Sequence, residues 1–257
     1  MIPKIIHYCW YGRGEMSDQI KATIKSWKEQ CPNYEIKRWD EDNSPKIKYL
    51  YDALKHHKWA FAADYMRFYV LYNEGGVYMD TDMYLIKPID QFLTHSSFVG
   101  REDMYNAAMG IIGMHKGDAI ANFCLNYYDK KGFDLVHPVV VTRLVTPELF
   151  RYGYTEVDET QYLSNGLVVY QSDYFYPIHY THKKPFSEIL QAATPNTYGI
   201  HWGCGSWGDE FSILGKGEYK QGFHLVWERF KRTPLLPLKY WMKVVKYFGN
   251  YIGIWKR

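Results

Sequence analysis

The stretch GGVYMDTDMYLIKP, residues 75 to 88, places two carboxylates one residue apart at the end of an otherwise apolar run. The apolar residues 77–79 before the acids are typical of a buried strand. An extended chain points alternate side chains to one side, so Asp80 and Asp82 are expected to share a face, about 6 to 7 Å apart along the chain. Two unpaired carboxylates at this separation repel each other and raise each other's pKa.

A divalent cation between the two carboxylates would relieve this repulsion. Hard oxygen ligands favour Mg²⁺ or Mn²⁺ over softer metals. Two carboxylates cannot fill six coordination positions, so water, a further side chain and ligand oxygens would complete the set. A diphosphate is the ligand that best suits such a site, because its oxygens are hard donors and its charge is opposite to that of the metal.

The residues before this stretch predict an α/β fold. KIIHYCWYG, from Lys4, indicates a buried strand that ends in a turn at Gly12. Apolar residues then recur at helical spacing over 20–27, and YEIKRWDEDN, from Tyr34, indicates a second strand. Strand, helix and strand in this order are typical of the opening of an α/β nucleotide-binding fold.

The segment WAFAADYMRFYVLYNEGG, from Trp59, predicts a helix that ends at Gly75. Apolar residues surround most of it, so we expect it to be buried. Asp64 and Arg67 are the charges well inside it, and their spacing places them on one face. Because a buried ion pair is a poor source of stability, a functional role is indicated; the alternative is a salt bridge between helix and sheet.

Further strands are expected over 96–103, 107–115, 166–172 and 197–202, with a helix over 117–129. The chain has 257 residues, of which 47% are hydrophobic and 23% charged, so it can form one large α/β domain, and both disorder and a multi-span membrane protein are unsupported. The four cysteines form no C-x-x-C pair and are expected to be reduced core thiols. Without a leader or a long apolar segment, a cytoplasmic location is expected.

The charge is distributed unevenly along the chain. Residues 229–257 hold eight Lys or Arg and no acid, so residues 1–228 carry +3 − 8 = −5. This asymmetry argues against nucleic acid as a partner. In the segment from Pro234, three lysines share one helical face, and Trp241 lies among the apolar residues opposite. We therefore expect a basic amphipathic helix on an anionic membrane surface; the alternative is a helix docked on its own domain. We therefore expect a catalytic domain over residues 1–232 and a basic amphipathic tail over residues 233–257.

At this point the sequence resembles the DXD glycosyltransferases of glycosyltransferase family 32, a group that includes yeast Golgi mannosyltransferases and bacterial capsule and O-antigen transferases. It is distantly similar to the clostridial toxin glucosyltransferases. The resemblance is carried by IPKIIHYCWYG at Ile2, PNYEIKRWDEDN at Pro32, AADYMRFYVLYNEGGVYMDTDMYLIKP at Ala62, NAAMGIIGMHKG at Asn106 and HWGCGSW at His201. It implies a GT-A fold, in which helices flank a central, mixed, mostly parallel sheet and the nucleotide-sugar binds at the carboxyl ends of the strands.

The resemblance also implies roles for individual residues. The metal, Mn²⁺ or Mg²⁺, would be held by Asp80, Asp82 and His201. The residues implied in catalysis or in donor contacts are Asp64, Arg67, Asp80, Asp82 and Asn106. Those implied in binding the base, the sugar or the diphosphate are Tyr8, Trp10, Gly75, Gly76, Tyr78, Ser206 and Trp207. Core packing is the alternative for Tyr8 and Trp10, and strand-edge capping is the alternative for Asn106.

The resemblance implies transfer of a hexose from a nucleotide-sugar with retention of the anomeric configuration. UDP-hexose is the donor that the resemblance favours. The acceptor would be a glycan or a lipid-linked saccharide, such as one carried on polyprenyl diphosphate at the inner face of the plasma membrane, in surface polysaccharide synthesis. Two other readings stay open on the sequence: a non-catalytic module that binds a divalent ion and carbohydrate, and a phosphohydrolase that uses Asp80 as its nucleophile. The first would not need Asp64 and Arg67, and the second usually carries its motif on the first strand.

Overall fold

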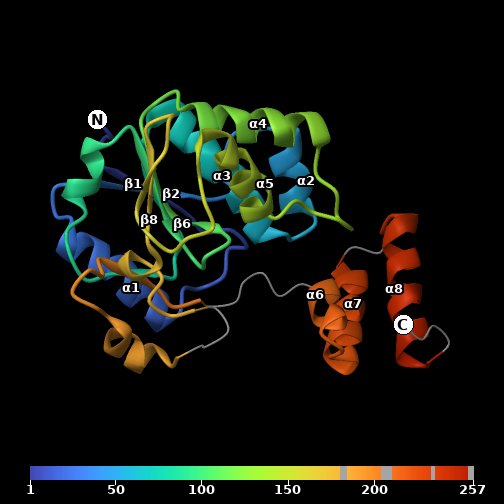
Figure 1. The fold of residues 1–257 in the computed structure, drawn as a ribbon. Coiled ribbons are helices and arrows are strands. Elements are labelled where there is room, and N and C mark those ends of the chain that lie inside the picture. The colour runs from blue at the N-terminus through green and yellow to red at the C-terminus, as the bar shows by residue number, and fades with distance from the viewer. Residues whose placement is uncertain (180–183, 204–209, 233–234, 254–257) are drawn as a thin grey trace. The chain divides into compact units, whose positions relative to one another are not determined.

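The computed structural model describes residues 1–179, 184–203, 210–232 and 235–253 (Figure 1). The chain divides into two compact units, residues 1–133 with 139–204, and residues 134–138 with 205–257. The second unit contains the predicted tail and two further helices before it, whereas the predicted domain boundary at 232/233 stays a prediction.

A mixed sheet forms the centre of the first unit. Its strands are β1 (Ile5–Cys9), β2 (Glu35–Trp39), β3 (Gly76–Met79), β5 (Ser97–Arg101), β6 (Ala107–Met114), β7 (Gln161–Tyr162) and β8 (Leu167–Tyr170). Within the described residues the order of these seven strands is β2-β1-β3-β6-β5-β8-β7. Strand β1 pairs in parallel with β2 and β3, and β5 with β8, whereas β6 and β7 pair antiparallel with their neighbours. Five strands thus share one direction, which confirms the predicted mixed, mostly parallel sheet.

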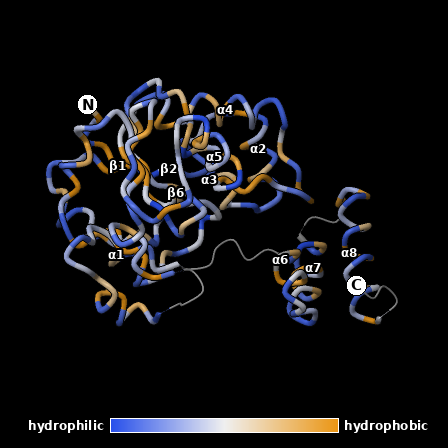
Figure 2. The backbone as a smooth tube through the Cα atoms, viewed as in Figure 1, coloured by the Kyte–Doolittle hydropathy of each residue, from blue (hydrophilic) through white to orange (hydrophobic). Residues whose placement is uncertain are grey.

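Helices cover both faces of this sheet, as Figure 1 shows. They are α1 (Asp18–Gln30), α2 (Lys48–Lys55), α3 (Trp59–Glu74), α4 (Ala119–Lys131) and α5 (Val141–Leu149), with short 3-10 turns η1 (Asp90–Thr94), η2 (Phe150–Tyr152), η3 (Ser172–Tyr174) and η4 (Phe186–Ala192). Strand alternation makes two cores: Leu167 and Val169 of β8 join the core of helices α2 to α5, whereas Val168 joins the core that contains Trp27 of α1. The apolar segments of the chain run through these layers in Figure 2.

Two glycines guide the chain from helix α3 into strand β3. Gly75 ends the helix with φ 72° and Gly76 follows with φ 110°, a region that other residues rarely adopt. A Cβ on Gly76 would lie 2.7 Å from the carbonyl oxygen of Ile5, so only glycine lets β3 approach β1 this closely. The predicted helix stop is confirmed. These glycines allow the chain to turn from α3 into β3. Their contact with the donor stays a prediction.

The cysteines that the structure describes, Cys9, Cys31 and Cys124, are buried free thiols, as predicted. Burial raises the pKa of the Cys9 thiol to about 12, so this thiol stays protonated and unreactive. Cys204 lies outside the described residues.

The second unit contains helices α6 (Glu210–Gly215), α7 (Tyr219–Arg232) and α8 (Leu238–Tyr251). The carboxylate of Glu210, which is buried, accepts hydrogen bonds from Arg229 of α7 and from the hydroxyl of Tyr240 of α8. One face of α8 is therefore packed within its own unit. Another face, which includes Leu238, Met242 and Val245, is exposed.

Candidate active site

The two acids of the D-x-D motif lie in a turn. Strand β3 ends at Met79, strand β4 (Met83–Leu85) begins directly after Asp82, and the backbone N–H of Met83 donates to the carbonyl of Asp80 at 2.9 Å. The prediction of an extended segment is therefore wrong here, because the chain turns out of the central sheet at this point. The turn brings the two carboxylates closer together than extended geometry would.

Strand pairing brings His201 to this turn. Strand β9 (Gly199–His201) pairs antiparallel with β4, and the register places His201 opposite Met83. The backbone N–H of Trp202 donates to the carbonyl of Asp82 at 3.0 Å, and Nε2 of His201 lies 3.1 Å from Oδ1 of Asp82. A short two-stranded sheet thus joins residues that are far apart in the sequence.

The side chains of Asp80, Asp82 and His201 can hold a metal ion. One ligand atom from each residue lies within 4.8 Å of the others. Two carboxylate oxygens and one imidazole nitrogen suit Mn²⁺ or Mg²⁺, and an octahedral ion would keep further positions for water and diphosphate oxygens. The predicted set of three residues is therefore brought together by the fold, and its donor atoms fit the metal implied by the sequence.

The charges in this set are strongly coupled. Burial disfavours the imidazolium form of His201, but the neighbouring Asp82 and Asp80 carboxylates outweigh it and raise the pKa of His201 to about 9. Burial and the charge of Asp82 raise the pKa of Asp80, against the opposing effect of Arg67. Without a metal, the proton on His201 compensates the acids, and a bound cation would replace that proton.

Arg67 of α3 lies behind the D-x-D turn and is 2% exposed. Its Nη2 donates to Oδ1 of Asp80 at 3.0 Å and lies 3.3 Å from Oδ1 of Asp64, which is fully buried. The guanidinium also stacks on the ring of Tyr78, 4.7 Å from its centre. This arrangement fixes the orientation of Asp80. Direct contact of Asp64, Arg67 or Tyr78 with the donor sugar stays a prediction, because all three are buried beneath the site.

The other predicted residues lie at several places. Tyr8 of β1 is buried edge-on against Trp27, and the indole N–H of Trp10, just after β1, donates to the carbonyl of Gly14 at 2.8 Å. The side-chain amide of Asn106 donates to the carboxylate of Asp103, which is the capping role that the sequence left open. Ser206 and Trp207 lie outside the described residues.

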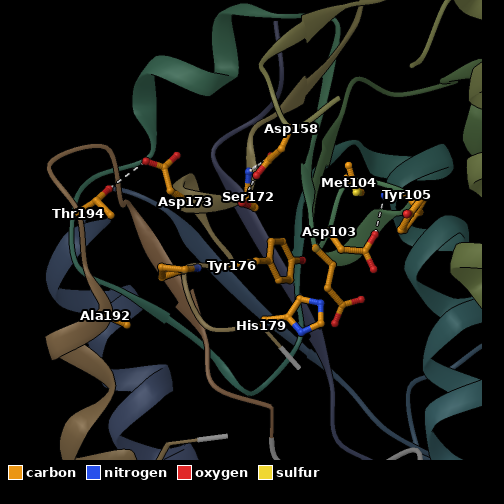
Figure 3. Close-up of a pocket in the computed structure, with 12 residues that line it drawn as sticks. Asp103, Met104, Tyr105, Asp158, Ser172, Asp173, Tyr176, His179, Ala192 and Thr194 are labelled. Carbon is orange, nitrogen blue, oxygen red and sulfur yellow. Dashed lines mark hydrogen bonds between the residues drawn. The ribbon is translucent and has the colours of Figure 1, made fainter. Parts of the chain in front are cut away.

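A cavity of about 620 Å³ opens beside the metal-binding set (Figure 3). Strands β3, β5 and β8 run parallel, so their carboxyl ends share one edge of the sheet, where ligands bind in open α/β folds. Glu102 and Asp103 follow β5, and Ser172 and Asp173 follow β8. This cavity was not predicted from the sequence; its signal was the pair of acids at the end of the strand predicted over 96–103, at the same edge as Asp80.

Tyr176 connects the cavity to the metal-binding set. Figure 3 shows its ring between Asp173 and Thr194 on one side and Asp103 and His179 on the other. The ring centre lies 5.3 Å from that of His201, and the phenolic oxygen accepts a hydrogen bond from the backbone N–H of Ile111 at 3.1 Å. Burial and the nearby Glu102 raise the pKa of Tyr176, so its hydroxyl keeps its proton and can donate it to a ligand.

The mixed sheet, the D-x-D turn at a strand end and the histidine beside it form a site of the kind that the resemblance to DXD glycosyltransferases implied. Residues 17–99 match the family model described as "Glycosyltransferase sugar-binding region containing DXD motif". This part of the chain is therefore similar to the sugar-binding region of that family, which confirms the resemblance inferred from the sequence.

Known relatives agree with this assignment. Over 157 residues, 58% of the chain, it is 25% identical to inositol phosphoceramide mannosyltransferase 3 of Schizosaccharomyces pombe, of which this region covers 43%. It is 27% identical over 194 residues to an uncharacterized glycosyltransferase of Acanthamoeba polyphaga mimivirus, with 69% of this chain and 74% of that protein covered. The chain thus spans well under two thirds of the yeast relative.

The chain is also similar to a solved structure, the PaToxG glycosyltransferase. The match covers 58% of this chain and 68% of the PaToxG chain, with 20% sequence identity and a TM-score of 0.47.

Proposed function

We propose that the protein is a metal-dependent, retaining glycosyltransferase that moves a hexose from a nucleoside-diphosphate sugar to a hydroxyl group of an acceptor. The convergence of Asp80, Asp82 and His201 at the end of β3 is the observation that carries this proposal. A non-catalytic carbohydrate-binding module would not need an arginine buried between Asp64 and the first D-x-D acid, Asp80.

The chemistry follows from the charge that develops during transfer. The bond between the anomeric carbon and the phosphate oxygen breaks, the acceptor oxygen forms the new bond to that carbon, and the acceptor's proton passes to the departing diphosphate oxygen. A bound Mn²⁺ or Mg²⁺ would stabilise the negative charge of the leaving diphosphate. Arg67 holds one oxygen of Asp80 and so fixes the geometry of the ligands. We propose a front-side route, since no carboxylate stands out in the sequence as the nucleophile of a double displacement.

The donor and the acceptor are further parts of the proposal. UDP-hexose is the donor that the sequence resemblance favours, whereas the name of the fission-yeast relative speaks of mannosyl transfer to inositol phosphoceramide. The name of the relative supports an acceptor with hydroxyl groups at a membrane, and we propose a saccharide on polyprenyl diphosphate in capsule or O-antigen synthesis.

We also propose that the protein works at the cytoplasmic face of the plasma membrane, as a peripheral protein. Helix α8 supports this, because apolar residues on it are exposed and Lys239 and Lys246 are exposed as well. No helix in the described ranges has the length and apolarity needed to cross a bilayer.

The test is donor hydrolysis in the absence of an acceptor. The full chain is incubated with Mn²⁺ and, separately, with UDP-glucose, UDP-galactose, UDP-N-acetylglucosamine and GDP-mannose, and released nucleoside diphosphate is measured. Release from one donor that stops with EDTA and returns with Mn²⁺ supports the proposal. A folded protein that releases nothing from any donor, or releases inorganic phosphate, contradicts it.

A further inference from the structure

The cavity beside the metal-binding set has walls of one charge. Twelve described residues line it, and four of them are acids: Glu102, Asp103, Asp158 and Asp173. Among the described lining residues there is no Lys or Arg. Its volume of about 620 Å³ is that of an ordinary small-molecule site. A ligand here meets hydrogen-bond acceptors and no described strong cation.

Three of the four acids are held in place by bonds within the chain. Asp103 accepts from the backbone N–H groups of Tyr105 and Asn106, Asp158 accepts from Ser172, and Asp173 accepts from the hydroxyl of Thr194. The walls are therefore rigid, and their remaining lone pairs point to fixed positions. Such preorganised acceptors favour a ligand that offers several hydroxyl protons.

Glu102 differs from the other three acids. Within the part of the chain that the structure describes, its side chain makes no hydrogen bond, although its backbone N–H is bonded to the carbonyl of Asn106. It lies close enough to His201 and Asp80 for their charges to affect it. An acceptor oxygen bound by Glu102 and Tyr176 would thus lie beside the metal-binding set.

We infer that this cavity is the acceptor subsite, that it takes a neutral ring rich in hydroxyl groups, and that any phosphate on the acceptor must lie outside it. The inference rests on the proposed function. In the transfer, one hydroxyl oxygen of the ring forms the bond to the anomeric carbon as the sugar–phosphate bond breaks, and its proton leaves with the diphosphate. A phosphate within the cavity would face the negative charges of the four acids, and no described Lys or Arg lines the cavity to compensate them. Such like-charge contacts are a common way in which a binding site excludes a ligand.

The experiment compares matched acceptors with the full chain, Mn²⁺ and the donor that it hydrolyses. Methyl α-mannoside, methyl α-galactoside and myo-inositol are tested against methyl α-mannoside 6-phosphate, methyl α-galactoside 6-phosphate and myo-inositol 1-phosphate. At least one neutral acceptor should form a glycoside product with kcat/KM about 100-fold above that of its phosphorylated partner. If a phosphorylated compound is used as well as its neutral partner, or if none of the neutral compounds forms product, the inference is overturned.

Two substitutions on one 3-10 turn test the location. Ala192 lines the cavity, whereas Leu190 is exposed outside it. Ala192→Trp should lower acceptor-dependent product formation at least about 10-fold relative to hydrolysis, because the indole would fill the acceptor space. Leu190→Trp should leave both rates unchanged. An unchanged ratio of transfer to hydrolysis in Ala192→Trp overturns the inference. If the wild-type protein hydrolyses no donor at all, the proposed function is contradicted instead.

Discussion

Arg67 is the counter-charge that two acids share, one fully buried and one partly exposed. Asp64 is fully buried on the same helix, and Asp80 follows β3. Burial raises the pKa of Asp64 well above its usual range, despite the opposing effect of Arg67. The ion pairs of Arg67 with Asp64 and Asp80 therefore orient Asp80 as a metal ligand. Burying these charges lowers the stability of the fold, as is common for buried ion pairs.

Replacing Arg67 by methionine tests this arrangement. Arg67→Met should lower the free energy of unfolding by about 3 kcal/mol, because the two acids lose their shared cation. Adding Asp64→Asn should recover part of this loss, since one buried charge is then removed. Urea denaturation of the single and double variants measures both effects. Additive losses, with no recovery in the double variant, would show that Arg67 and Asp64 are not coupled.

His201 gives the metal site a defined pH dependence. Its pKa of about 9 means that the metal-free protein carries an imidazolium at pH 7, whereas the imidazole must be neutral to bind an ion. Mn²⁺ binding at pH 7 should therefore release about one proton per ion, and affinity should rise with pH up to about 9. Calorimetry in buffers of different ionisation enthalpy measures the release; binding without proton release contradicts the assignment of His201 as a ligand.

At the scale of elements, strand β6 supports the site through a glycine. A Cβ on Gly110 would lie 2.9 Å from the hydroxyl oxygen of Tyr176, 3.2 Å from Cδ2 of His201 and 3.4 Å from Oδ2 of Asp80. The small residue at this position makes room for the metal-binding set and for the tyrosine that borders the cavity.

Alanine substitutions at two glycines of β6 should therefore have different effects, one on Mn²⁺ affinity and one on stability. Gly110→Ala should weaken Mn²⁺ binding about 10-fold, because it displaces residues that hold the ligands. Gly113→Ala places its Cβ 2.2 Å from Cε1 of Phe98, so it should cost about 1 to 3 kcal/mol of stability while Mn²⁺ affinity is kept. Calorimetric titration and thermal unfolding of both variants separate the two effects. Equal losses of affinity would refute the specific role of Gly110.

The sequence predicted most strands of the central sheet and helices α1, α3, α4 and α8, but neither helices α2, α5, α6 and α7 nor the geometry between the elements. The helix over 59–74 and the strand before Asp80 follow from local apolar patterns and from Gly75, and the structure contains both. The turn at Asp80 and Asp82 could not be read from the sequence, because it depends on the pairing of β4 with β9, more than a hundred residues later. The sequence did propose His201 as a ligand, but from family resemblance alone.

The cavity was missed for a related reason. Glu102 and Asp173 are ordinary acids in the sequence, and only the parallel alignment of β5 and β8 brings the ends of their strands together. Pairing between strands distant in sequence is the information that local periodicity lacks.

At the scale of the whole molecule, the chain combines a sheet-based unit that carries the proposed site with a unit of three helices. The tail of the second unit is packed in part through Tyr240, whose ring lies 4.9 Å from that of Phe211. Packing of α8 within its unit and binding of its exposed face to a membrane are therefore compatible, so the two alternatives drawn from the sequence do not exclude each other.

Membrane binding is tested by reversing exposed charges on α8. Lys239→Glu with Lys246→Glu should abolish sedimentation of the full chain with phosphatidylglycerol vesicles, because each lysine near an anionic surface contributes about 1 kcal/mol. Lys21→Glu with Lys25→Glu, an equal change of charge at exposed positions of α1, is the control and should sediment as the wild type does. Sedimentation of the α8 variant at the wild-type level would contradict peripheral attachment through this helix.

The central claim is that the acids of the D-x-D turn share one hard cation with a nucleoside diphosphate. Electron paramagnetic resonance of Mn²⁺, titrated with the full chain and UDP or GDP, tests it most directly. We expect one Mn²⁺ site whose affinity rises when the nucleotide is present, loss of that site in Asp82→Asn, and its retention in Asp90→Asn, where the acid is exposed and paired with Lys4. Unchanged Mn²⁺ binding by a folded Asp82→Asn variant, or no binding by the wild type with either nucleotide, would contradict it.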